Sequence, residues 1–392
     1  MENKWPVRKL GDICEVLNGF AFKSDKYVDE GVRIIRITNV QHGYIEDNDP
    51  KFYPIDECER LNQYMLKEQD LLMSLTGNVG RVGLLDNKFL PAALNQRVAC
   101  LRVKNENVEL KYLFHHLNSE LFETRCIQSA KGIAQKNMST EWLKEYPIPI
   151  PPLPEQFRIV EELDQLSNII EKKRQQLSEL DNLAQSIFYD MFGDPVTNEK
   201  GWEVKTIGDI VMSVNYGTSS PASEDGKYKY LRMNNLTYSG FLDLKDLKTI
   251  TIGEKEYEKY VVRKGDILFN RTNSKDLVGK TALFDLDEEM IIAGYIIRVR
   301  VNNQMVLPVF VVKHMNTPYI KQYLANLCKG AVNQANINTK ELQKIPIFIP
   351  SLHLQQLFAL KIEAIEKEKE LIKQSIKETE ELFNSRMDYY FG

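Results

Sequence analysis

One pattern occurs twice in the chain and restricts its fold more than any other: a proline-rich ribbon followed by a long run without Pro or Gly. The first ribbon is YPIPIPPLPEQ, residues 146–156, and the run after it reaches Phe192. Proline fixes φ near −65° and pushes the preceding residue out of the helical region, so the ribbon predicts an extended edge or a polyproline segment. The run after it predicts a long helix. A second ribbon, IPIFIPSLHLQQ at 345–356, precedes a second such run to Phe391.

The rest of the two halves also matches, at an offset that drifts by only a few residues. WPVRKLGDI at 5–13 corresponds to WEVKTIGDI at 202–210, and DLLMSLTGNVGRVGLLD at 70–86 corresponds to DILFNRTNSKDLVGKTALFD at 266–285. The segments that lead into the two ribbons, from 131 and from 329, match as well. We interpret this as an internal duplication, in which each half is a globular module followed by a long helix.

Within each module, short β-rich runs precede an amphipathic segment. In the first half these runs are VRIIRITNV (32–40), DLLMSL (70–75) and VACLRV (98–103), followed by 109–130; in the second they are YKYLRMNNL (228–236), DILFN (266–270) and IIRVRV (296–301), followed by 309–327. The expected fold class is therefore α/β in the mixed α+β sense. The expected boundaries are 1–154 and 194–350 for the modules, and 155–193 and 351–392 for the helices.

Apolar residues in the two long runs recur at spacings of four and three, which is the heptad pattern of a coiled coil. Two such helices in one chain are expected to pair with each other, and the intervening module allows them to run antiparallel. The alternative is that each helix packs on its own module. The residues expected to pair the helices are Ile159, Leu163, Leu166, Ile170, Leu177, Leu180 and Ile187, with Phe358, Ile362, Ile365, Ile372, Ile376 and Phe383.

Composition indicates a soluble protein of a reducing cytoplasm. The 392 residues are too many for one core, and five cysteines without CxxC spacing indicate neither a disulfide framework nor a zinc site. The amino terminus is polar, and no apolar run approaches the length of about 18 residues that a membrane span needs. The formal net charge is −4, but residues 155–192 carry 4 basic and 8 acidic side chains and 355–391 carry 6 and 8. The modules are therefore mildly basic, and a local basic patch is what phosphate binding requires.

No pattern in the sequence predicts a catalytic or metal site. GNVGRVG (77–83) lacks the GxGxxG spacing of a dinucleotide fingerprint, and Gly279-Lys280-Thr281 lacks the earlier glycine of a phosphate loop. His115 and His116 are adjacent, so they do not share a helix face as metal ligands. No metal and no cofactor is expected on this chain.

Polar and basic residues follow the predicted strands at equivalent positions of both modules. Arg, Asn and Gln make bidentate contacts with base edges, and Lys with Ser or Thr holds phosphates. Each residue taken singly is more often a solvated loop residue, but their recurrence favours DNA binding. The candidates are Lys23, Ser24, Arg36, Asn39, Gln41, Thr76, Asn78, Arg81, Gln96 and Arg97 in the first module, and Tyr216, Thr218, Ser219, Arg232, Asn234, Asn235, Arg271, Thr272, Asn273 and Lys275 in the second.

At this point the sequence resembles the specificity subunit of a Type I restriction-modification enzyme over its whole length. The resemblance is carried by the WxxxxLGDI-like start of each half, by the Gly- and Gln-containing segment before each ribbon, and above all by IPIPPLPEQFRIVEELD (148–164). The second ribbon departs from this pattern at Ser351 and His353, where the first has prolines.

The resemblance implies a non-catalytic DNA reader with two target-recognition domains. Each domain would read one half of a bipartite, asymmetric target in double-stranded DNA, and the antiparallel helices would set the gap between the halves. Two modification subunits, which bind S-adenosylmethionine and methylate adenine, would dock beside the helices, and restriction subunits that use ATP and magnesium would join them.

Two other classes of function remain open from the sequence. One is an enzyme, as a fragment of a fused methyltransferase-nuclease, and the other is a coiled-coil scaffold whose modules bind protein.

Overall fold

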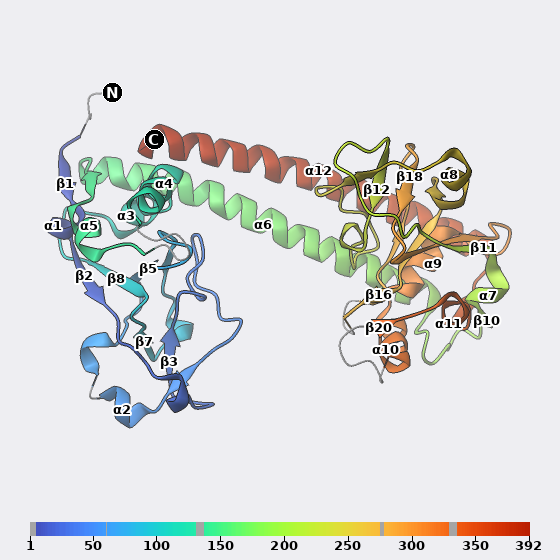
Figure 1. Ribbon diagram of the computed structural model, residues 1–392, viewed down its shortest axis with the longest axis horizontal. Helices are drawn as coiled ribbons and strands as arrows, with labels where there is room; N and C mark the ends of the chain where they lie inside the picture. Colours follow the sequence, from blue (N-terminus) through green and yellow to red (C-terminus); the bar gives the residue numbers. More distant parts are fainter. Residues whose placement is uncertain (1–4, 60, 131–136, 275–277, 329–334) are drawn as a thin grey trace. The chain divides into compact units, whose positions relative to one another are not determined.

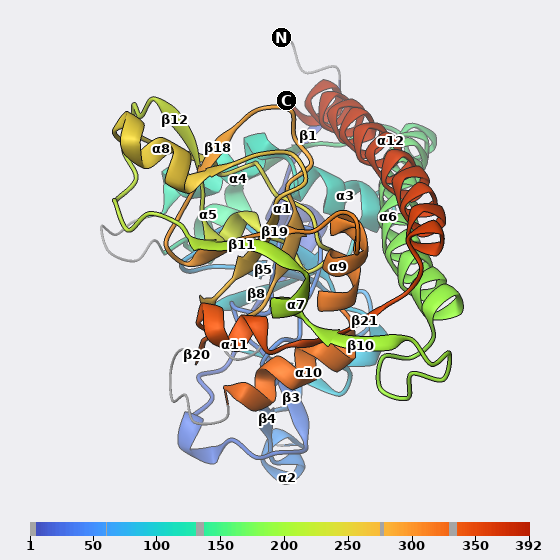
Figure 2. The same cartoon turned by 90° about the vertical axis from the view of Figure 1, so that its right-hand side faces the viewer.

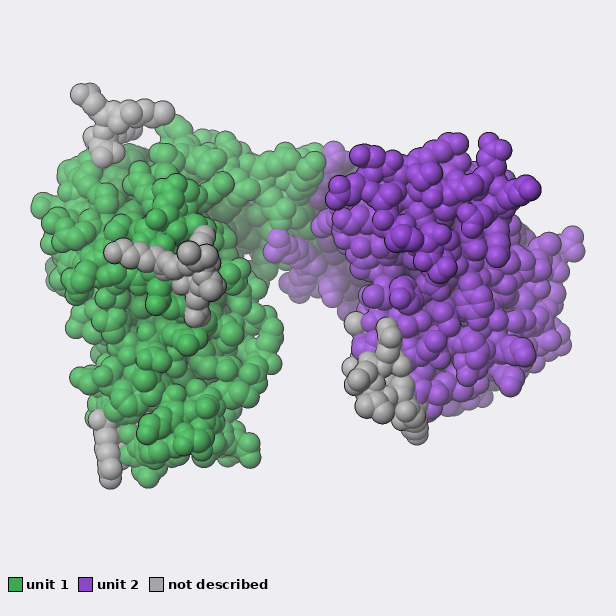
Figure 3. All heavy atoms as spheres, in the orientation of Figure 1, with its two compact units in different colours: residues 1–173, 375–392 green, residues 174–374 purple. Residues whose placement is uncertain are grey.

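The computed structural model describes residues 5–59, 61–130, 137–274, 278–328 and 335–392. The chain forms two compact units (Figure 3): unit 1 is Met1–Lys173 with Ser375–Gly392, and unit 2 is Arg174–Gln374. Two 40-residue helices, α6 (Leu153–Phe192) and α12 (Leu352–Phe391), each contribute to both units. Each unit therefore combines one module with the start of one long helix and the end of the other.

The module of unit 1 is built on a four-stranded antiparallel sheet (Figure 1) in the order β2-β8-β5-β6. A three-stranded sheet, β4-β3-β7, and a pair, β1-β9, complete its strands. Its elements are β1 (Val7–Lys9), α1 (Leu10–Ile13), β2 (Cys14–Asn18), β3 (Val32–Ile35), β4 (Phe52–Tyr53), α2 (Ile55–Glu59), β5 (Leu71–Ser74), β6 (Val82–Leu84), β7 (Ala92–Leu94), β8 (Val98–Val103), α3 (Leu110–Leu117), α4 (Glu120–Ser129), α5 (Thr140–Glu145) and β9 (Pro147–Pro149).

Unit 2 repeats this plan, with the four-stranded sheet in the equivalent order β11-β19-β15-β17. Its other sheets are β13-β12-β18-β14, β10-β21 and β16-β20. Its elements are β10 (Glu203–Thr206), α7 (Ile207–Ile210), β11 (Val211–Tyr216), β12 (Tyr228–Leu231), β13 (Lys248–Ile250), α8 (Glu254–Tyr260), β14 (Val261–Val262), β15 (Ile267–Asn270), β16 (Thr272–Asn273), β17 (Thr281–Leu283), β18 (Met290–Ile292), β19 (Ile296–Val301), α9 (Pro308–Met315), α10 (Pro318–Leu327), β20 (Ala335–Asn336), α11 (Thr339–Gln343) and β21 (Pro346–Ile349). The mixed α/β fold and the internal repeat are thereby confirmed.

Several elements differ in length from their sequence expectations. The expected strand 32–40 ends at Ile35, because the chain turns there. The single amphipathic segment 109–130 is two helices, α3 and α4, since Ser119 caps the second one through its side chain. Helix α6 begins at Leu153 rather than Glu155. Pro154 is tolerated as its second residue, because the N–H groups of a first helical turn have no acceptor within the helix.

Each proline ribbon forms an edge strand and ends on a buried glutamine. β9 pairs with β1, and β21 pairs with β10, both antiparallel. Gln156, which has no exposed surface, accepts a hydrogen bond from the backbone N–H of Glu109 (2.8 Å) and donates to the carbonyls of Asn107 (2.8 Å) and Pro151 (2.7 Å). The glutamine therefore fixes the start of α6 to both the ribbon and the loop before α3.

Gln355 makes the equivalent contacts in unit 2. Its side chain accepts from the N–H of Leu307 (2.8 Å) and donates to the carbonyls of Met305 (3.2 Å) and Pro350 (2.9 Å). The repeated Gln at the end of each ribbon is thus explained by the polar groups that the helix start would otherwise leave without partners.

Within each unit, α6 and α12 pack against each other and run antiparallel. In unit 1, Ile159 and Leu163 share a core cluster with Met387 and Tyr390, while Lys173 contacts Ser375. Residues later in α6 therefore contact residues earlier in α12, as expected for antiparallel helices.

In unit 2, Phe192 packs on Phe358, with ring centroids 5.0 Å apart, and Asp181 contacts Lys369. In Figure 2, where unit 2 faces the viewer, α9 lies between the sheet that contains β11 and the two long helices.

The residues expected to pair the helices are all at least half-buried. The buried ones are Ile159, Leu163, Phe358, Ile362, Ile365 and Ile376, and the half-buried ones are Leu166, Ile170, Leu177, Leu180, Ile187, Ile372 and Phe383. A lysine stands among them in each helix. The ammonium of Lys173 donates to the hydroxyls of Ser375 (2.6 Å) and Thr379 (3.1 Å), and that of Lys369 pairs with Asp181 (2.6 Å).

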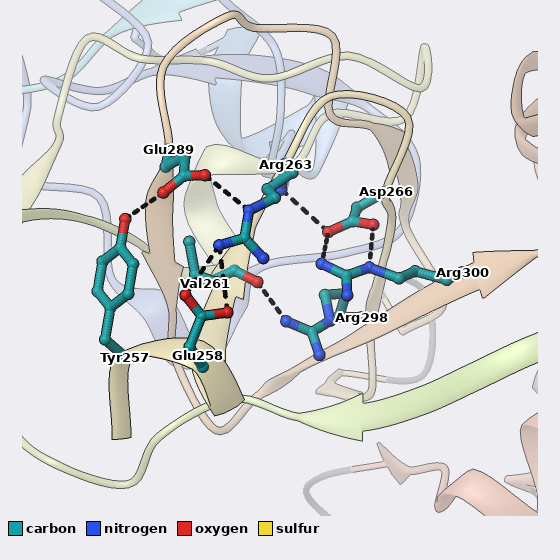
Figure 4. A network of polar contacts seen from close by, with 8 residues as sticks. All are labelled: Tyr257, Glu258, Val261, Arg263, Asp266, Glu289, Arg298 and Arg300. Atoms are coloured by element: carbon teal, nitrogen blue, oxygen red, sulfur yellow. Dashed lines mark hydrogen bonds and ion pairs between the residues drawn. The ribbon is translucent and has the colours of Figure 1, made fainter. Parts of the chain in front are cut away.

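A buried aspartate precedes the central strand of each module. Asp70 accepts two hydrogen bonds from the guanidinium of Arg102, both at 2.7 Å. Asp266 does the same with Arg300, at 2.7 and 3.0 Å, and also accepts from the backbone N–H of Arg263 (Figure 4). The recurrence of Asp70 and Asp266 in the sequence therefore reflects a structural ion pair that fixes the turn into the strand.

Candidate nucleic-acid interface

Five of the residues predicted in the second module line one cavity of about 560 Å³ in unit 2. β11 and β15 both pair antiparallel with β19, so they run parallel to each other and end at the same edge of the sheet. The loops that follow them therefore meet, together with the loop after β12. The predicted residues among the lining are Thr218, Ser219, Arg232, Asn234 and Arg271.

The Arg271 side chain is held in place at this edge of the sheet by an aromatic ring. Its guanidinium lies over the ring of Tyr216, 4.8 Å from the ring centroid. The tyrosine hydroxyl in turn accepts a hydrogen bond from the N–H of Thr339 (3.0 Å), which fixes the ring. Within the described part of the chain, Arg271 has no acidic partner. A guanidinium that is stacked on a ring and lines a cavity can donate two hydrogen bonds to a guanine edge.

Arg232 and Asn235, by contrast, serve the fold of their own loop. Asn235 is 1% exposed; its side chain accepts from the N–H of Arg232 (2.8 Å) and donates to the carbonyl of Asp243 (2.8 Å). The Arg232 guanidinium pairs with Asp246 (2.6 Å), which also accepts from Asn234 (3.2 Å).

The same arrangement recurs in unit 1. Asn39 is 5% exposed, accepts from the N–H of Arg36 (2.9 Å) and donates to the carbonyl of Glu46 (3.0 Å), while Arg36 pairs with Asp49 (3.1 Å). The recurrence of these Arg and Asn residues, which favoured DNA binding in the sequence, has a structural reason: they close equivalent loops. Their recurrence is therefore not evidence for DNA binding by Arg36, Asn39, Arg232 and Asn235.

In unit 1 the predicted residues that come together are Gln41, Asn78 and Arg81. The Arg81 guanidinium donates to the side-chain oxygen of Gln41 (2.6 Å), and the amide of Asn78 lies within 3.3 Å of the same guanidinium. Arg81 follows Gly80, which has a φ of 87° and whose Cβ, if present, would lie 2.8 Å from the Cβ of Cys126. Only glycine fits this tight turn, and the turn presents the arginine.

The remaining predicted residues are not gathered into these clusters. Thr76 is buried and forms a bridge with Asn137, and Thr272 and Asn273 form the short strand β16. Lys23, Gln96 and Arg97 are exposed in loops of unit 1, and Ser24 is exposed at the start of a short 3-10 helix, Ser24–Lys26. Lys275 lies outside the described residues.

Several residues of the cavity were not predicted from the sequence, and two of them are large and exposed. Met233 and Tyr295 line it and are 36% and 53% exposed. Tyr295 stands directly before β19, and in the sequence it looks like the first residue of that strand. The sequence therefore does not indicate that its side chain is exposed. An apolar surface beside a polar one is suited to contact with a thymine methyl group.

The described residues contain no group of three or more His, Cys, Asp or Glu side chains arranged to hold a metal ion. His115 instead contacts Asp164 of α6 (2.8 Å), and burial lowers the pKa of His116 to about 4. None of the described helices has the combination of length and apolar character that a membrane span requires.

Comparison with protein families gives a match to both halves of the chain. The profile described as "Type I restriction modification DNA specificity domain" matches residues 2–182 and 199–381. The chain is similar to the EcoBI specificity subunit of Escherichia coli, with 22% identity over 93% of this chain and 80% of that protein. It is also similar to the MjaVIII specificity subunit of Methanocaldococcus jannaschii, with 30% identity over 47% of this chain and 44% of that protein.

Two solved structures share the fold over nearly the whole length. A crystal structure of the Type I restriction-modification S subunit from M. genitalium has a TM-score of 0.55 at 14% identity and covers 98% of this chain and 96% of its own. A chain from a study of complex assembly and conformational transition of the type I R-M system has a TM-score of 0.55 at 18% identity, covering 99% and 97%.

Proposed function

Because this chain belongs to the family of Type I restriction-modification DNA specificity subunits, which are not catalytic, we propose that its two modules read the two halves of one bipartite target. The proposed modules are residues 1–154 and 194–350, and each is proposed to contact double-stranded DNA through the loops at one edge of its four-stranded sheet. The partner helices at 155–193 and 351–392 are proposed to set the gap between the half-sites.

The observation that carries this proposal is that the same sheet edge bears different chemistry in the two units. In unit 2, Arg271 at the end of β15 is stacked on Tyr216 and has no acidic partner among the described residues, whereas the arginine at this edge in unit 1 is Arg81, which stands before β6 and donates to Gln41. Two modules with one fold and different contact groups suit an asymmetric target better than a palindrome, which would need two identical readers.

The helices suit a spacer because they are long and paired in both units. A 40-residue helix is about 60 Å long at about 1.5 Å per residue. Apolar packing between α6 and α12, with one satisfied lysine in each, fixes their register. A change in helix length would therefore change the distance between half-sites and leave the half-sites themselves unchanged.

As a subunit of a Type I system, the chain is proposed to act with partners that supply the chemistry. Two modification subunits, docked beside the long helices, would bind S-adenosylmethionine and methylate adenine. Restriction subunits would use ATP and magnesium. The cytoplasm is the proposed compartment, since the DNA and these partners are there.

Sequencing of methylated bases in DNA tests the proposal. The chain is expressed with its modification subunits in cells without other methylation, and a bipartite motif with two different halves is expected. Arg271→Ala and Arg81→Ala should each relax one half only, by about 1 to 3 kcal/mol where the arginine reads a base. Lys255→Ala, at an exposed lysine on α8, is the control. A continuous motif, or relaxation of the same half by both variants, would contradict the proposal.

The enzyme alternative is tested with the purified chain alone. Incubated with labelled S-adenosylmethionine and target DNA, it should transfer no methyl groups. Transfer by the chain alone would place it in the class of fused methyltransferases.

A further inference from the structure

The β15–β17 hairpin of unit 2 presents a second basic group close to Arg271. The backbone carbonyl of Lys280 accepts a hydrogen bond from the N–H of Asn270 (2.8 Å), the residue before Arg271. Lys280 therefore stands opposite the end of β15, on the other limb of the hairpin. It follows Gly279, whose φ of 82° gives the same tight turn that Gly80 gives in unit 1.

Two lysines flank one exposed tyrosine beside this hairpin. The ammonium of Lys280 lies 5.0 Å from the centroid of the Tyr238 ring, and that of Lys321, from α10, lies 5.8 Å from the same centroid. Tyr238 is 42% exposed, and both lysines are half-buried. The two positive charges are thus held near each other and near solvent by one aromatic ring.

Within the described parts of the chain, no acidic group pairs with the lysines of this cluster. Among the described residues, neither lysine forms an ion pair, and the only hydrogen bond from Lys321 goes to the carbonyl of Gly279 (2.5 Å). Burial, and then repulsion from Lys280, lower the pKa of Lys321 to about 7. An anion between the two ammonium groups would relieve the repulsion and accept hydrogen bonds from both.

Unit 1 does not repeat the cluster. Arg81 occupies the place of Lys280 but donates to Gln41. Gly80 lies against Cys126 of α4, and the equivalent Gly279 lies against Leu324 of α10. The residue three positions before this contact is Glu123 in unit 1 and Lys321 in unit 2. Unit 2 therefore has two cations where unit 1 has one cation and one carboxylate.

We propose that Lys280 and Lys321, spaced by the ring of Tyr238, bind a phosphate of the DNA backbone next to the base that Arg271 reads. The inference rests on the proposed function of this sheet edge. The contact is independent of sequence, because a phosphate is the same on every nucleotide, and it positions unit 2 on the duplex. The DNA affinity of unit 2 is therefore expected to depend more strongly on salt concentration than that of unit 1.

The test measures DNA affinity of the complex of this chain with its modification subunits, at several KCl concentrations. Each variant is titrated with a duplex that carries the methylated motif and with a scrambled duplex. Lys280→Gln and Lys321→Gln should weaken binding to both duplexes by the same factor. Each should also make the slope of log K against log salt shallower by about one unit. Lys255→Gln, at an exposed lysine of the same unit, should change neither quantity.

The outcomes separate this inference from the proposed function. A native complex that does not prefer the motif duplex overturns both. A native complex that prefers it, with variants of unchanged slope, overturns the phosphate contact alone. Loss of affinity only for the motif duplex would mean that these lysines read bases, which also overturns the contact.

A second measurement needs no variant. The complex is treated briefly with an amine-reactive reagent at neutral pH, with and without the scrambled duplex, and modified lysines are identified by mass spectrometry. DNA should protect Lys280 and Lys321 and leave Lys255 unprotected. Equal labelling of Lys280 and Lys321 with and without DNA contradicts the contact, and inorganic phosphate at millimolar concentration should give no comparable protection.

Discussion

Replacing Gln156 with Met tests the explanation given for the end of the proline ribbon. Methionine fills nearly the same volume without strain, but it removes one acceptor and two donors at once. The N–H of Glu109 and the carbonyls of Asn107 and Pro151 then lose their partner. A net hydrogen bond contributes about 1 kcal/mol, and an unsatisfied buried N–H costs more, so the variant should lose about 3 kcal/mol of unfolding free energy.

The assay for Gln156→Met combines urea unfolding with hydrogen exchange. The amide of Glu109 should exchange faster in the variant, because its acceptor is gone, while amides of unit 2 keep their protection. Gln176→Met, at an exposed position of the same helix, should stay within about 0.5 kcal/mol of the native chain. An unfolding free energy within 1 kcal/mol of the native value, with the Glu109 amide still protected, would refute the role assigned to this glutamine.

Two further predictions concern the buried groups of unit 1. Burial lowers the pKa of His116 to about 4, against about 6.5 in the unfolded chain. The neutral imidazole therefore contributes its full stabilisation above pH 6.5, and about 3 kcal/mol of unfolding free energy is lost as the pH falls to 4. His116→Phe should reduce this loss of stability at acid pH, measured as the difference between the urea midpoints at pH 7 and pH 4. The same difference in the variant and the native chain would contradict the prediction. Phe391→Ala should cost about 3 to 5 kcal/mol and speed exchange in α3 but not in α9, because Phe391 packs on Tyr112 (5.5 Å between ring centroids) and His116 (5.3 Å); faster exchange in α9 would argue against that assignment.

The sequence predicted those features that depend on local pattern. The proline ribbons, the two long helices and the repeat are recorded in residue type and spacing, and the structure has them nearly where they were expected. The strand order was not predictable in this way. β2 pairs with β8, from Cys14–Val103 to Asn18–Ala99, and nothing local in either strand specifies a partner so far along the chain.

The candidate site was predicted less well than the fold, for two physical reasons. A residue recurs in both modules when the fold needs it as well as when a ligand does, and Asn39 and Asn235 recur because each closes a loop. In addition, a cavity brings together loops from distant strands, so exposure of Met233 and Tyr295 depends on packing that the sequence does not display. Arg271 was predicted, but its stacking on Tyr216 is known only from the structure.

The central claim, that paired helices hold two different readers at a set distance along DNA, is tested most directly by lengthening both helices. Four residues, about one helical turn, are inserted into the middle of α6 and of α12, which adds about 6 Å. Methylation sequencing should then find the same two half-sites with a gap longer by one or two base pairs, since base pairs rise about 3.4 Å. The same insertion into the loop at 194–201 should leave the gap unchanged. An unaltered gap in the lengthened chain, or new half-sites, would contradict the account.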